Sequence, residues 1–281
     1  IVGYLKRHLS HVSLKPNTIE TYRQVERYLT LYGDTDLNKV TTDYLQGFVS
    51  YLESSTLSKG TVYLYFSKLK CVLHDAYKND LFDERILLRV KAPRRERKNK
   101  VFLTEAELRR MAKVDIPESK QNIRDMFLFS SFTGLRFSDV LGLKRKDIVK
   151  KGDQMTINFH QRKTSTYESL PLSEQARQII LTQASSGTYV FGRESEPNVN
   201  TFLKQLCRQA KIKKNISFHT ARHTFCVMLL SHDVPIFTVQ KLMCHSDIRS
   251  TNVYADILNK TKSKAVKKLP VIDDIAMRKV G

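Results

Sequence analysis

The sequence predicts a mostly α-helical protein, with an N-terminal helical bundle followed by a mainly helical domain that contains a small three-stranded antiparallel sheet. Three observations lead to this prediction. Apolar residues upstream of residue 90 recur with a helical period, whereas residues 147–172 alternate polar and apolar side chains as a half-buried sheet does. A basic, proline-containing stretch lies between these patterns. We therefore divide the 281 residues into domains at 1–90 and 101–281, joined by a linker at 91–100.

The first domain is predicted to be a bundle of helices. Pro16 suits the first turn of a helix that Gly33 ends. A second helix is predicted over residues 42–53, and a third begins after residue 60 and carries Lys68 and Lys70 on its surface. Alone, such a basic bundle would be a DNA-binding module without chemistry of its own.

The linker is dense in positive charge, and its cations after Pro93 are Arg94, Arg95, Arg97, Lys98 and Lys100. The whole chain has a formal net charge of +20. This excess favours a polyanionic partner, because cations that bind nucleic acid release its counterions. A solvated basic surface is the alternative. No basic amphipathic helix with a Trp-rich face points to an anionic membrane.

The second domain begins with a helix start in which Thr104 and Glu107 have the spacing of a capping box. An apolar run over residues 126–132 predicts a buried helix that stops at Gly134, and a turn at residues 151–153 separates the first two strands. Further helices are predicted at 173–184, 198–210, 218–231, 235–243 and 248–257.

The cysteines and the hydropathy of the chain indicate where in the cell the protein is expected. The four cysteines form no C-x-x-C pair, which argues against a zinc ribbon or a disulfide framework. The chain has no apolar run of about 18 residues and no secretion signal, so we expect an intracellular protein without membrane contact. Because the chain begins with Ile1 rather than Met, we expect that the natural protein extends further upstream.

The stretch HTARHTF places His219, Arg222 and His223 within a turn and a half of predicted helix. Two histidines four residues apart can bind a metal, but the general-base Glu of such motifs is missing and Arg222 would repel a divalent cation. His219 and Arg222 share a helix face and can present two donors to an anion. His223 points elsewhere, and we interpret it as a core histidine. The stretch therefore favours a phosphate site.

A second arginine lies in the stretch TGLRFSDVLGLK, where Gly134 ends one predicted helix and Arg136 opens the next. This position fixes the guanidinium of Arg136 beside backbone donors at a helix N-terminus. A surface salt bridge with Asp139 is the alternative interpretation. Neither arginine establishes a function alone.

Three motifs in order resemble those of the tyrosine recombinases, also called the phage integrase family. They are TGLR, HTARH and LMCHSDIRSTNVYADI, and in the last of these Tyr254 follows His245 by nine residues. The resemblance covers essentially the whole chain. It implies that residues 1–90 form a SAM-like core-DNA-binding domain and residues 101–281 a catalytic domain with a C-terminal tail. Among recombinases, the chain looks most like a mobile-element integrase of the conjugative transposon or phage type.

The family's catalytic residues correspond to Arg136, Lys163, His219, Arg222, His245 and Tyr254, with Asp139 in a supporting position. The resemblance implies that the two arginines clamp the scissile phosphate, that the histidines hydrogen-bond to it, and that the tyrosine is the nucleophile. Lys163 lies at a predicted turn between two strands, next to Arg162, which could be confused with it.

These residue types suit attack on a phosphodiester. A tyrosine hydroxyl has a pKa near 10, so it must lose its proton and meet a phosphate whose charge is neutralised. Two guanidiniums can stabilise the charge of the transition state without a metal. Lys163 would protonate the departing 5′ oxygen, and His219 would act as a general base or a donor.

The chain departs from the family pattern in two places. Cys244 stands before the second histidine, where the family usually has Gly, and is either accommodated by a local shift or borders the site. His219 to His223 reads H-T-A-R-H, which keeps the catalytic positions and loses an acid and an apolar residue. Neither departure removes a reactive group.

The resemblance implies a 3′-phosphotyrosine intermediate, formed without metal or ATP or any other cofactor. It implies a homotetramer that joins two duplexes through a four-way junction, and it admits host DNA-bending proteins as accessory partners. A bacterial, cytoplasmic, nucleoid-associated protein would fit these partners. The C-terminal tail could dock on its own domain or on a neighbouring subunit.

Other functions remain open at this stage. A type IB topoisomerase would use a similar set of residues as a monomer, and site-specific cleavage that needs synapsis would distinguish a recombinase from it. A DNA-binding protein with a degenerate catalytic domain would be favoured if one of Arg136, Lys163, Arg222 or Tyr254 were missing, and none is. Integration of a mobile element and resolution of chromosome dimers both fit a recombinase. The expected upstream region would hold an arm-binding domain in many integrases, which mildly favours integration.

Overall fold

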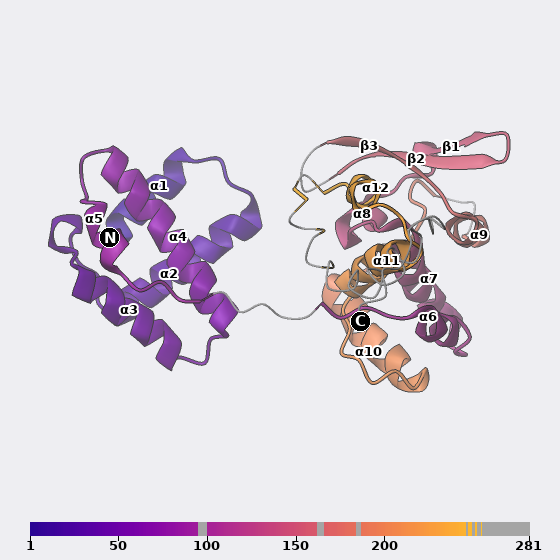
Figure 1. Cartoon of the computed structure of the whole chain (residues 1–281), viewed down its shortest axis with the longest axis horizontal. Coiled ribbons are helices and arrows are strands. Elements are labelled where there is room, and N and C mark those ends of the chain that lie inside the picture. Colours follow the sequence, from indigo (N-terminus) through magenta and orange to yellow (C-terminus); the bar gives the residue numbers. More distant parts are fainter. Residues whose placement is uncertain are drawn as a thin grey trace, which may run out of the picture. The chain divides into compact units, whose positions relative to one another are not determined.

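The computed structural model describes residues 1–94, 100–161, 166–183, 187–245, 247, 248, 251 and 254. The chain forms two compact units, Ile1–Lys98 and Asn99–Gly281 (Figure 1). Each unit has a hydrophobic core of its own. Both units are mainly helical and the second contains a three-stranded sheet, so the predicted fold class is confirmed.

The first unit consists of five α-helices and one short 3-10 helix, Leu37–Lys39. The α-helices are α1 (Val2–His11), α2 (Pro16–Tyr32), α3 (Thr42–Ser54), α4 (Lys59–Lys78) and α5 (Arg85–Arg89). Pro16 is the first residue of α2, as predicted, and the side chains of Thr41 and Ser58 cap α3 and α4. The helix α1, of which only Leu5 is buried, was not predicted from the sequence.

The second unit surrounds a buried pair of helices. Its helices are α6 (Glu105–Ala112), α7 (Glu118–Thr133), α8 (Phe137–Gly142), the 3-10 turn Arg145–Asp147, α9 (Glu174–Thr182), α10 (Glu196–Gln209), α11 (His219–Ser231) and α12 (Ile236–Leu242). The helices α7 and α11 pack against each other in the core. Thr104 and Glu107 form the predicted capping box at the start of α6. Most of the helix predicted at 248–257 lies outside the described residues.

The sheet contains β1 (Ile148–Lys151), β2 (Gln154–His160) and β3 (Tyr167–Pro171), in that order and antiparallel throughout. Ile157 in the central strand pairs with Ile148 on one side and Leu170 on the other. Alternate residues of β2 are buried, which is the period of two that the sequence showed. Residues 162–165, between β2 and β3, are outside the described part of the chain.

Two contacts attach the start of the second unit to its core. The backbone N–H of Leu103 donates to the hydroxyl of Thr224 on α11, with 2.9 Å between nitrogen and oxygen, and both residues are buried. The ammonium of Lys214 donates to the carbonyl of Phe102 at 2.9 Å and pairs with Glu107 at 2.6 Å. The chain is therefore bound to α11 immediately after it enters the unit.

Within the described residues, every helix is too short or too polar to cross a membrane.

Candidate catalytic site

Arg222 lies in the first turn of α11, and its side chain reaches backbone oxygens from two distant segments. Its two Nη atoms donate to the carbonyls of Gly134, at the end of α7, and Met243, at the end of α12. Arg222 is only 4% exposed, and burial together with the nearby charge of Arg136 lowers its pKa to about 10. The guanidinium therefore remains charged at neutral pH, in an orientation that the two carbonyls fix.

Gly134 makes this arrangement possible by its backbone conformation. Its φ of 70° is in the left-handed region, where glycine is unstrained, and its N–H caps α7 by donating to Ser130. A Cβ atom at this position would lie 2.5 Å from the ring of Phe225 and 3.1 Å from the sulfur of Met243. A side chain here would displace the elements that carry Arg222.

Arg136 directly precedes α8 and is held by two side chains. Its Nη1 donates to Oε1 of Gln161 at 2.8 Å, and it lies 3.9 Å from the carboxylate of Asp139. The carboxylate of Asp139 is buried, with the residue only 4% exposed, so its ion pair with Arg136 is not a surface salt bridge. The structure therefore brings Arg136, Asp139 and Arg222 together.

Gln161 is a site residue that sequence reasoning missed. It is 2% exposed, and its amide bridges Arg136 and the carbonyl of Cys244, with 3.5 Å between Nε2 and that oxygen. The only signal in the sequence was its place at the head of the stretch QRKTST. Lys163, two residues further on, lies outside the described residues.

Tyr254 is buried and its hydroxyl is hydrogen-bonded to Nδ1 of His223. Burial raises the pKa of Tyr254 well above its usual value, an effect that Cys226 increases and Arg222 opposes. Burial, with a further contribution from the nearby His219, lowers the pKa of His223 to about 3. His223 is therefore neutral near pH 7. It was interpreted as a core histidine, but it contacts the predicted nucleophile.

The remaining predicted histidines lie at the edge of the same region. His219 is exposed at the start of α11, and its ring meets that of His223 edge to face, with 4.5 Å between centroids. His245 is half-buried, and its Nδ1 lies 2.9 Å from the hydroxyl of Thr251. Its backbone N–H donates to the carbonyl of Gln240 at 3.0 Å.

Cys244, which stands where the family usually has Gly, adopts a left-handed conformation with a φ of 48°. This conformation is strained for a residue with a Cβ atom, and it explains why glycine suits the position. Cys244 borders the site through its carbonyl, which accepts the bond from Gln161. Burial raises the pKa of its thiol to about 11, so the side chain is a neutral thiol at pH 7.

The predicted DNA-binding cations are distributed over both units. Arg94, Lys100 and Lys70 are exposed, whereas Lys68 is half-buried with its ammonium 5.0 Å from the centre of the Tyr22 ring. Arg95, Arg97 and Lys98 lie outside the described residues. Among the residues that the structure describes, no group of three or more His, Cys, Asp or Glu side chains could hold a metal ion.

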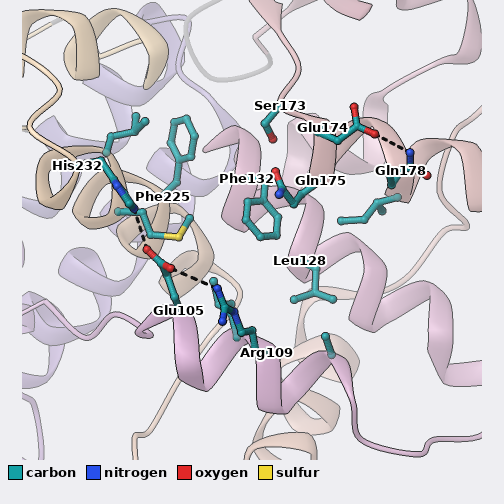
Figure 2. A pocket seen from close by; sticks show the side chains of 15 residues that line it. Glu105, Arg109, Leu128, Phe132, Ser173, Glu174, Gln175, Gln178, Phe225 and His232 are labelled. Carbon is teal, nitrogen blue, oxygen red and sulfur yellow. Dashed lines mark hydrogen bonds and ion pairs between the residues drawn. The ribbon is translucent and has the colours of Figure 1, made fainter.

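A separate groove of about 740 Å³ lies between α6, α7, α9 and α11 (Figure 2). Phe132 and Phe225 point into it, and His232, Glu105 and Arg109 form a chain of polar contacts along its rim. Of the predicted catalytic residues that the structure describes, none lines this groove. The candidate chemistry therefore belongs to the cluster around Arg222.

Comparison with known proteins agrees with these observations. Residues 101–261 match the family model described as Phage integrase family, and residues 1–92 match that of the Phage integrase SAM-like domain. A tyrosine recombinase from Thermosipho africanus is 24% identical over 96% of this chain and 99% of its own length.

Two solved structures share the fold. The Tn1549 transposon integrase, in complex with transposon right end DNA, has a TM-score of 0.76 and 19% identity over 95% of this chain and 98% of the other. A lambda integrase tetramer bound to a Holliday junction has a TM-score of 0.71 and 17% identity over 88% of this chain and 74% of the other.

The fold and the sequence matches define a tyrosine recombinase, an enzyme that cleaves and rejoins DNA strands in site-specific recombination. The match of 101–261 extends over more than half of the chain. The chain belongs to the phage integrase family.

Proposed function

We propose that Tyr254 attacks a DNA phosphodiester held by Arg136 and Arg222 and forms a 3′-phosphotyrosine bond with release of a 5′ hydroxyl. The observation that carries this proposal is the convergence of the three side chains. The charge of Arg136 helps to lower the pKa of Arg222, and the charge of Arg222 opposes the rise in the pKa of Tyr254, although these residues come from distant parts of the sequence.

The guanidinium of Arg222 has five N–H donors, and the carbonyls of Gly134 and Met243 orient it. The other donors of Arg222, together with Arg136, are proposed to bind the non-bridging phosphate oxygens. Donors that are fixed before the reaction stabilise developing charge without reorganisation in the transition state. Asp139 and Gln161 would hold Arg136 in position for this role.

The remaining steps are proton transfers. Lys163 is proposed to protonate the departing 5′ oxygen and His219 to act as the general base that takes the hydroxyl proton of Tyr254, while His245 donates a hydrogen bond to the phosphate. The phosphotyrosine bond keeps the energy of the phosphodiester, so the 5′ hydroxyl of a partner strand can rejoin it without ATP. No metal is required in this scheme.

DNA is the proposed partner, bound by the N-terminal unit as a core-DNA-binding domain and by the basic residues near the linker. The net charge of +20 and the exposed Arg94 and Lys100 support this proposal. Binding should weaken steeply as salt increases, and a flat salt titration would contradict a DNA partner. The tetrameric lambda integrase on a Holliday junction supports a homotetramer that acts through a four-way junction, and the transposon integrase supports integration of a mobile element.

The test uses nicked suicide duplexes drawn from DNA that flanks the gene, without added metal, followed by denaturing electrophoresis. We expect a covalent protein–DNA band with the natural chain and none with Tyr254→Phe, which removes a nucleophile and no charge. Tyr22→Phe is the matched control, because Tyr22 is as buried as Tyr254, at 4% exposure each. DNA binding should persist in all three. A covalent band with Tyr254→Phe would disprove the assignment.

A further inference from the structure

His223 is the residue that contacts the hydroxyl of Tyr254, although the resemblance assigns it no role. Its Nδ1 shares a hydrogen bond with that hydroxyl, and the two rings lie with their centroids 5.6 Å apart. Tyr254 also belongs to a cluster of buried apolar residues of α11 and α12, including Phe225, Leu230 and Val239. A buried hydroxyl without an acceptor is costly, so this contact contributes to where the phenol lies.

The direction of the hydrogen bond follows from the charge state of His223. Burial disfavours the imidazolium form of His223, and the neighbouring His219, Lys100, Arg222 and His245 add to this effect. A neutral imidazole has one nitrogen that accepts and one that donates. The phenol is neutral as well, so its O–H donates to Nδ1.

We propose that His223 is a positioning residue for the nucleophile: its Nδ1 accepts a hydrogen bond from the hydroxyl of Tyr254 and fixes the phenol oxygen beside Arg222. The role in strand cleavage rests on the proposed function of Tyr254. His223 lies directly after Arg222 on α11, so one helical turn holds both the proposed phosphate donor and the contact that orients the attacking oxygen. This juxtaposition sets the distance between nucleophile and phosphate within one rigid element.

His223→Asn and His223→Leu form a matched pair for testing this role. Asn and Leu have nearly the same branched shape, but only the amide oxygen of Asn can replace Nδ1 as an acceptor. Both variants lack the imidazole and fill a similar volume. A purely structural role for the ring would affect the two variants alike.

The first measurement needs no DNA. Tyrosines of the folded protein are nitrated with tetranitromethane, and tryptic peptides are quantified by mass spectrometry. Residues 250–260 form a tryptic peptide with Tyr254 as its one tyrosine, and residues 8–23 form one with Tyr22, an equally buried reference. We expect His223→Leu to raise nitration of Tyr254 several-fold relative to Tyr22, and His223→Asn to leave it near the natural level.

The second measurement is the single-turnover rate of covalent attachment to a suicide duplex. We expect His223→Leu to slow attachment by about tenfold to a hundredfold at equal DNA affinity, since small misplacements of reacting groups have effects of this size. His223→Asn should restore most of the rate. Failure of the natural chain to attach would disprove the proposed function, whereas the nitration comparison would still test the hydrogen bond.

Three results would overturn the proposal. One is a Leu variant that matches the natural chain in both measurements. Another is equal slowing in both variants without a change in nitration, because it would make the imidazole a packing element. The third is faster attachment in the Leu variant, because the bond would then restrain the nucleophile rather than position it.

Discussion

Thr224→Val tests whether the entry of the chain into the second unit is bound to α11 as the structure describes. The hydroxyl of Thr224 accepts from the N–H of Leu103 at 2.9 Å and donates to the carbonyl of Thr220 at 2.8 Å. Valine keeps the shape of the side chain and removes only the hydroxyl. Because Leu103 is 1% exposed and Thr224 is fully buried, water cannot replace the lost acceptor.

A buried N–H without an acceptor costs about 1–3 kcal/mol. Taking about 2 kcal/mol, the unfolding midpoint of a unit of this size should fall by roughly 4–8 °C. Circular dichroism melting of the DNA-free protein measures the shift, and hydrogen exchange should show faster loss of the Leu103 amide proton.

Thr201→Val is the matched control. Its hydroxyl makes the same kind of bond within a helix of the same unit, to the carbonyl of Pro197 at 2.9 Å, but in an exposed position. We expect this substitution to change stability by less than about 0.5 kcal/mol. Equal midpoints for the two valine variants would refute the reasoning, because the amide of Leu103 would then not depend on Thr224.

Three further predictions concern the site. Arg222→Ala should lower the rate of covalent attachment by a factor that corresponds to roughly 3 kcal/mol, and a near-normal rate in the suicide-duplex assay would leave Arg222 with a structural role only. Cys244→Gly should raise the free energy of unfolding by up to about 1 kcal/mol, because glycine adopts a φ of 48° without strain; a lower denaturation midpoint would contradict this. The free energy of unfolding should fall as pH decreases from about 6.5 to about 3. In the folded protein His223 has a pKa of about 3 and stays neutral over this range, whereas in the unfolded chain its imidazole is protonated below about 6.5. Denaturant titrations should show this dependence weakened in His223→Asn, and an unchanged pH profile would argue against a buried neutral imidazole.

Local patterns in the sequence predicted much of the fold. Thr104 and Glu107 form the predicted capping box, and Gly134 ends α7 in a left-handed conformation. The alternating pattern over residues 147–172 corresponds to the observed sheet. Each of these signals acts within a few residues, so tertiary context was not needed to interpret it. The helix α1 was not predicted, although Val2, Leu5 and Leu9 have helical spacing; of these residues only Leu5 is buried.

The site itself depended on contacts that no local pattern contains. The spacing of His219 and Arg222 indicated that they share a helix face, and it placed His223 on another face. No nearby residue in the sequence indicated that His223 would contact Tyr254. Gln161 has no reactive group, so its role is visible only from its bonds to Arg136 and Cys244. Roles of this kind depend on which distant segments meet.

The two carbonyls that hold Arg222 have a consequence for how the protein is made. Gly134 leaves the ribosome long before Met243, and domains form as their residues emerge in order from the N-terminus. The side chain of Arg222 cannot be held by both carbonyls until translation has passed Met243, which lies 11 residues before Tyr254. A chain that ends before Met243 therefore lacks both the second carbonyl that orients Arg222 and the proposed nucleophile, Tyr254, so both parts of the proposed site are completed late in translation.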